Sequence, residues 1–134
     1  MIVTEWADDS KRVICIHFTS PFTREEYEQM NAQKVQMMKS VAHPVDLILD
    51  ASQTRTIPAD LFNEFRRSAQ WVIETKQLEN LILAHSNVFI RSLVQMMIEM
   101  YPQISHKIRL AKSVEEAREL LQKKYTAIQN TPSS

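Results

Sequence analysis

The chain has 134 residues, with 16 basic and 16 acidic side chains that give a formal net charge of zero, one cysteine and no glycine. Proteins that bind nucleic acid over their whole surface are usually basic, so we expect no nucleic-acid partner, with only a local basic patch left open. The absence of glycine excludes the glycine-rich phosphate loop, the dinucleotide-binding turn and the nucleophile elbow of many hydrolases.

Length and composition predict one domain over residues 1–134, long enough to bury a core. The single cysteine, Cys15, cannot form a disulfide within the chain, which suits a reducing compartment. The first residues lack the basic start and apolar run of a signal peptide, and no stretch approaches the roughly 20 apolar residues that span a bilayer. We therefore expect a cytoplasmic protein without a membrane span.

A hairpin is predicted at the beginning of the chain. Residues 2–6 and 13–19 have the short apolar alternation of strands, and a polar turn at 7–11 separates them. Because this link is short, the two strands are expected to pair antiparallel.

The next segment is predicted to be an amphipathic helix. Thr23 and Glu26 have the spacing of a capping box, and Phe22 and Tyr27 lie where a hydrophobic staple would close around it. The apolar stripe of this helix has one polar member, Lys34. The expected stripe comprises Tyr27, Met30, Lys34, Met37, Met38 and Val41.

The remaining chain alternates between strands and helices. The nearly continuous apolar run 45–50 is typical of a strand buried on both faces of a parallel sheet. Pro58 suits the first turn of the helix that follows. Shorter apolar segments at 81–85 and 107–111 predict two more strands, and each is followed by Ser or Asn side chains that can cap a helix.

The resulting order ββαβαβαβα predicts an α/β fold. Strands that alternate with helices pair in parallel through right-handed crossovers, so we expect a mixed, mostly parallel sheet of five strands with four helices. Residues 129–134 are expected to form a disordered tail.

A binding site is expected where the parallel strands end, because ligands of open α/β sheets bind outside the carboxyl ends of the strands. Two helix amino termini should point to this edge, which favours an anion. The alternative is that these polar groups only satisfy backbone donors and solvent. The candidate residues are Asp50, Ser52, Thr54, Arg55, His85, Ser86, Asn87 and Arg91.

No catalytic residues, metal site or cofactor are predicted. The side chains His17, His43, His85 and His106 are scattered, and Cys15 with His17 supplies two ligands where zinc takes three or four. A hydrolase triad would need hydrogen bonds and an oxyanion hole that no spacing here provides. We therefore expect a protein that is not an enzyme.

Six of the seven methionines lie on two predicted helices, and we expect ordinary core packing there, with a pliable apolar pocket or partner groove as the alternative. On the helix between these two, Trp71 lies off the apolar stripe, so Phe62, Arg66 and Trp71 are the candidate partner surface, at a rim or in a homodimer contact.

Three segments resemble the STAS domain and its wider SpoIIAA-like fold, and most of all the soluble, stand-alone STAS-like proteins of bacteria. They are SPFTREEYEQM after the hairpin, LILDASQTRTIP from strand to helix, and the closing KIRLAKSVEEARELL. The resemblance covers nearly the whole chain and implies a SpoIIAA-like sheet.

In antagonist STAS proteins a serine at the helix start is phosphorylated by a partner kinase within a D-S-S/T-G motif. Aligned on Asp50, the serine position falls on Ala59 and the glycine position on Leu61. The resemblance therefore implies a module without the usual phosphoacceptor, in which Ser52, Thr54 or Thr56 would be the alternative modified groups.

Three functions follow as hypotheses. The first is a non-enzymatic STAS-like regulatory module that presents residues 51–56 and the next helix to a protein partner, as a monomer or a homodimer. The second is a carrier of a small apolar ligand or lipid in a methionine-lined pocket. The third, ranked last, is an enzyme with an anion site at the strand edge.

Overall fold

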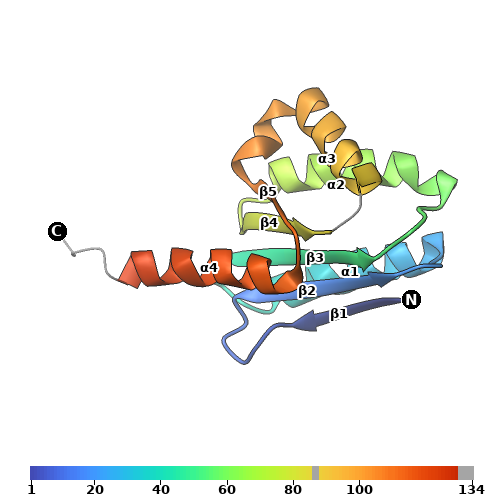
Figure 1. The fold of residues 1–134 in the computed structure, drawn as a ribbon. Helices are drawn as coiled ribbons and strands as arrows, with labels where there is room; N and C mark the ends of the chain where they lie inside the picture. Colours follow the sequence, from blue (N-terminus) through green and yellow to red (C-terminus); the bar gives the residue numbers. More distant parts are fainter. Residues whose placement is uncertain (86–87, 130–134) are drawn as a thin grey trace.

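The computed structural model describes residues 1–85 and 88–129, apart from the side chains of Phe62, Phe89, Ile128 and Gln129, and it confirms the α/β fold and the predicted element order (Figure 1). The elements are β1 (Ile2–Trp6), β2 (Val13–Thr19), α1 (Arg24–Lys39), β3 (Val45–Gln53), η1 (Ala59–Leu61), α2 (Phe62–Glu74), β4 (Leu78–Ala84), α3 (Val88–Met100), η2 (Pro102–His106), β5 (Ile108–Ala111) and α4 (Val114–Gln129). Most of the predicted tail, residues 130–134, lies outside the described part, and Gln129 belongs to α4.

The five strands stand in the sheet in the order in which they occur in the chain, β1-β2-β3-β4-β5. The pair β1–β2 is antiparallel and the other three pairs are parallel, as predicted. Because the order does not reverse among the described strands, the sheet has no switch point of the kind at which doubly wound sheets open a crevice. The ligand site of this fold has to be sought elsewhere.

The sheet is covered unequally on its two faces (Figure 1). Residues of α1, α2 and α3 pack with the side of the sheet that carries Ile14, Ile16 and Leu47. The opposite side, with Ile48 and Ile82, is covered by α4. The alternation predicted for the second strand is therefore confirmed, with apolar side chains directed to both layers.

Local signals fix the ends of several elements. Thr23 accepts a hydrogen bond from the Glu26 amide, and the Glu26 side chain accepts one from the Thr23 amide, so the capping box is confirmed. In the hairpin turn, Asp8 accepts from the Ser10 amide at 2.9 Å. Lys11 has a φ of 55°, a left-handed conformation that glycine adopts without steric cost. The absence of glycine is thus accommodated here by a lysine.

Some predicted boundaries are wrong by a few residues. β3 continues through Gln53, because Thr19 of β2 still pairs with Gln53 beyond a local irregularity. β4 begins at Leu78 and ends at Ala84, earlier at both ends than predicted. Pro58 precedes a short 3-10 turn, and the α-helix begins only at Phe62.

A polar group anchors α4 to the sheet. Asp46 of β3 is buried and accepts hydrogen bonds from Asn80, Lys124 and Tyr125. Burial and the hydrogen bond to Asp46 raise the pKa of Tyr125, so this hydroxyl keeps its proton. The amino terminus of α4 is held by Ser113, whose hydroxyl accepts from the Glu116 amide.

Candidate functional site: an apolar pocket between sheet and helices

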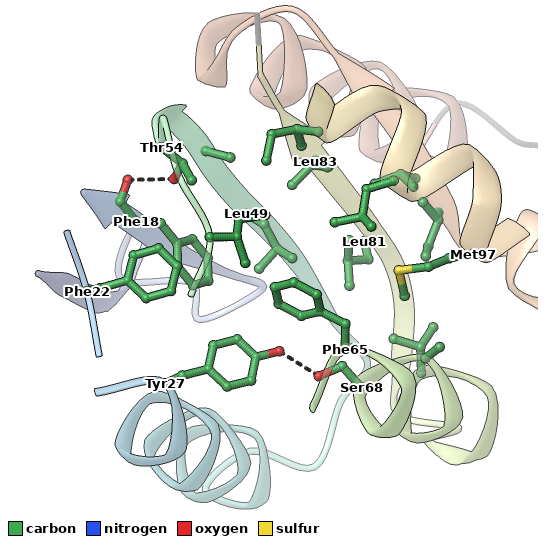
Figure 2. Close-up of a pocket in the computed structure, with 18 residues that line it drawn as sticks. Phe18, Phe22, Tyr27, Leu49, Thr54, Phe65, Ser68, Leu81, Leu83 and Met97 are labelled. Carbon is green, nitrogen blue, oxygen red and sulfur yellow. Dashed lines mark hydrogen bonds between the residues drawn. The ribbon is translucent and has the colours of Figure 1, made fainter. Parts of the chain in front are cut away.

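A pocket of about 150 Å³ lies between the inner face of the sheet and helices α1, α2 and α3 (Figure 2). It is half enclosed, and it occupies the half of the sheet toward the carboxyl ends of β3 and β4. Protein interiors are normally packed as densely as organic crystals, with few voids larger than a water molecule. A space of this size inside the main core is therefore a feature that needs an occupant or a reason.

The wall of the pocket is almost entirely apolar. Four aromatic rings form one side, and aliphatic side chains from the sheet and α3 form the rest. The aromatic members are Phe18, Phe22, Tyr27 and Phe65, and most of the aliphatic members are Leu49, Leu81, Leu83, Ile90, Leu93, Val94 and Ile108. The rings contact one another, with Phe18 at 5.6 Å from Phe22 and Tyr27 edge-on to Phe65 at 5.8 Å between centroids. Such contacts hold the rings in place and fix the shape of that side.

Small side chains create the space. On α2, Ser68 and Ala69 line the pocket with short side chains where a larger residue would fill the gap, and Ala51 of β3 does the same from the sheet. The consequence appears at Leu49, which lies in the central strand but is only partly buried, while Leu47 two residues earlier is fully buried. The helices thus close over the amino-terminal half of β3 and leave the other half lined by the pocket.

Three hydroxyl groups are the polar atoms of this wall. The Tyr27 and Ser68 hydroxyls hydrogen-bond to each other at 2.7 Å, and the Thr54 hydroxyl donates to the Phe18 carbonyl at 3.2 Å (Figure 2). Burial raises the pKa of Tyr27, so its hydroxyl is neutral at physiological pH. Among the described residues that line the pocket, none carries a charge.

The methionine prediction is confirmed for packing in α1 and is largely wrong for α3. Met30 and Met38 of α1 are buried in the core, as expected for the stripe. On α3, Met97 lines the pocket, whereas Met96 and Met100 are about half exposed. The pocket is lined by aromatic and branched aliphatic side chains rather than by a set of methionines.

Next to the pocket, Lys34 of α1 is buried against α2 with 7% of its surface exposed. Its Nζ lies 3.9 Å from the centroid of the Trp71 ring and donates to Asn31 Oδ1 at 2.9 Å. Burial lowers the pKa of Lys34 to about 8. Trp71, predicted as part of a partner surface, is therefore partly buried in the seam between α1 and α2.

The residues predicted for the strand edge do not form one cluster. Asp50 accepts hydrogen bonds from Ser52 and from His17 Nδ1, the latter at 2.9 Å, and Glu5 lies 3.1 Å from the other nitrogen of His17. Burial favours a raised pKa for Asp50, but the hydrogen bonds from Ser52 and His17 outweigh it and hold the pKa below its ordinary value. From the sequence, His17 was interpreted only as one of four scattered histidines. The parallel pairing of β2 with β3 places it opposite Asp50.

The other members of that predicted edge are separated from this group. Thr54 is buried and faces the pocket, and Arg55 and Arg91 are exposed. His85 is buried, and its Nδ1 has no hydrogen-bond partner in the described part of the chain. Ser86 and Asn87 lie outside the described residues. In the described part of the chain, no hydrogen bond or ion pair joins the side chain of Arg55 or Arg91 to the Asp50 group. Anion binding at this edge therefore stays a prediction.

Of the predicted partner surface, Arg66 is exposed on α2, and the Phe62 side chain lies outside the described part.

Among residues 1–85 and 88–129, no group of three or more His, Cys, Asp and Glu side chains could hold a metal ion. None of the helices in those ranges has the length and apolar character needed to cross a membrane. Comparisons with protein-family models, with curated proteins and with solved structures found no match.

Proposed function

We propose that the protein binds a small apolar ligand in the pocket between the sheet and helices α1, α2 and α3. The observation that carries the proposal is an uncharged, aromatic-walled space of about 150 Å³ inside the main core. Apolar cavities of about this size stay dry and take up benzene-sized molecules. Ligand sites are typically concave, mostly apolar and marked by a few polar groups, and the three hydroxyls of this wall fit that description.

The direct test is titration of the purified protein with toluene, followed by amide chemical shifts and by thermal unfolding. We expect shifts at the pocket-lining residues and a rise in the unfolding temperature, because a ligand at ten times its Kd stabilises the native state by about 1.4 kcal/mol. Native mass spectrometry of the protein as purified would show whether a ligand of this size accompanies it.

Two matched variants distinguish the pocket from ordinary core. Ala69→Leu adds a side chain that projects into the pocket and should abolish toluene binding with little loss of stability. Ala117→Leu makes the same change at a fully buried position on α4 that does not line this pocket, and should cost about 1–3 kcal/mol through overpacking. Equal destabilisation by both changes, with no toluene binding to the parent protein, would contradict the proposal.

A second candidate function is a STAS-like module that binds a protein partner, as the resemblance of the sequence implies. The supporting observations are that Arg55 and Arg66 are exposed and that α3 has the exposed apolar side chains Val88, Met96 and Met100. Large apolar side chains gathered on a surface often mark an interaction site. A pull-down in which Arg55→Glu retains every partner of the parent protein would exclude the loop as part of that site.

A further inference from the structure

We propose that the ligand of this pocket is a neutral single-ring aromatic molecule that carries one hydrogen-bond acceptor, and that Ser68 donates to it. The inference rests on the proposed function and adds the chemical class of the ligand. It comes from the size and lining of the pocket and from the hydrogen bond between Tyr27 and Ser68.

Size and shape select a single ring. The volume of about 150 Å³ matches the space that holds benzene in other proteins. The rings of Phe18, Phe22, Tyr27 and Phe65 line one side, with Tyr27 and Phe65 at a steep angle of 76° to each other. Aromatic rings pack well edge-to-face or offset-stacked against such walls.

Two hydroxyls that line the pocket, those of Tyr27 and Ser68, form a hydrogen bond with 2.7 Å between the oxygens. A phenol is more acidic than an aliphatic hydroxyl, so it is the better donor of the two, and the serine oxygen is the better acceptor. We therefore assign Tyr27 as the donor and Ser68 as the acceptor of this bond.

With this direction, the proton of Ser68 itself is left for another acceptor. Serine in a helix commonly donates to a carbonyl one turn earlier, but in the described part of the chain the hydrogen-bond partner of the Ser68 hydroxyl is Tyr27. Because Ser68 lines the pocket, its O–H is available to an acceptor atom on the ligand.

The ligand should be uncharged. Burying an ion without a counter-charge is far more costly than burying a neutral group, and the described lining offers hydroxyls only. The cation Lys34 is directed to Trp71 and Asn31 and does not line the pocket.

Benzene and pyridine make a suitable pair of probes, because both are single six-membered rings and pyridine, uncharged at pH 7, differs by one acceptor nitrogen. Each is titrated into the ¹⁵N-labelled protein and into Ser68→Ala, Tyr27→Phe and Ser40→Ala. Ser40→Ala is the matched control, because it makes the same change at an exposed serine that does not line the pocket and whose proton is donated to the Met37 carbonyl. Circular dichroism verifies that each variant is folded.

We expect Ser68→Ala to weaken pyridine binding about tenfold, the worth of one hydrogen bond at 1.4 kcal/mol, and to leave benzene binding within about twofold. Tyr27→Phe should weaken pyridine binding less, and Ser40→Ala should change the binding of neither probe. Benzene binding without pyridine binding, or pyridine binding that Ser68→Ala leaves unchanged, would overturn the ligand class and leave the pocket function standing. If neither probe binds the parent protein, the proposed function fails with it.

Discussion

The buried Lys34 leads to a prediction about stability that follows directly from the structure. Its amine lies between α1 and α2, where no carboxylate of the described residues pairs with it, and burial lowers its pKa from 10.5 to about 8. The contacts with Trp71 and Asn31 favour the charged form and oppose a further decrease. The change to test is Lys34→Met, which keeps an unbranched chain of similar length and removes the charge.

The magnitude comes from the two pKa values. A change in pKa from 10.5 to about 8 means that keeping the amine protonated at pH 7 costs the folded state about 3 kcal/mol, at about 1.4 kcal/mol for each tenfold change in proton affinity. Between pH 8 and pH 10.5 the unfolded chain therefore binds more protons at Lys34 than the folded chain does. The free energy of unfolding must rise with pH across that range, by roughly 2–3 kcal/mol between pH 7 and pH 10.

At pH 7 we expect Lys34→Met to be more stable than the parent by about 1–2 kcal/mol, because the lost contact with the Trp71 ring offsets part of the gain. The variant should also lose the rise between pH 7 and pH 10. Urea unfolding followed by circular dichroism at several pH values measures both effects. Other groups that titrate in this range are common to the two proteins and cancel in the difference.

Lys39→Met serves as the control, since Lys39 lies on the same helix but is exposed. Its stability curve should run parallel to that of the parent at every pH. If the curve of Lys34→Met also runs parallel to the parent, Lys34 does not change its protonation on folding in this way, and the reasoning is refuted.

Two further predictions concern the turn and the last helix. Lys11→Gly should raise the free energy of unfolding by about 0.5–1 kcal/mol in thermal denaturation, because glycine adopts the positive φ of 55° without steric cost; a loss of stability would contradict this. Tyr125→Phe should lower it by about 1–3 kcal/mol in urea unfolding, because the buried carboxylate of Asp46 loses a donor, and an unchanged midpoint would show that Asn80 and Lys124 suffice.

The elements could be predicted from the sequence because their signals are local. The capping box of Thr23 and Glu26 lies within one helical turn, and the apolar run at 45–50 identifies a central strand wherever it is placed. Alternation along the second strand separates two faces without knowledge of the neighbouring strands. Boundaries were less predictable, because the extension of β3 to Gln53 depends on pairing with Thr19 across the sheet.

The pocket could not be predicted, because it is a property of the distance between elements. Ser68 and Ala69 are unremarkable in a helix pattern, and only their position against Leu49 makes them walls of a pocket. Thr54 was expected beside Arg55 at a polar edge, yet it turns inward because its hydroxyl can donate to the Phe18 carbonyl. Predicting this would have required the path of the chain after β3.

The in-sequence order of the strands has a consequence for how the chain reaches this structure. Every strand pairs with the one before it, so each pair can close over a short loop or a single helix as the chain is synthesised, without waiting for a distant partner. The exception is α4, whose Tyr125 reaches 79 positions back to Asp46. All five strands can thus assemble progressively from the amino terminus, and the contact of α4 with β3 has to wait until the last helix is made.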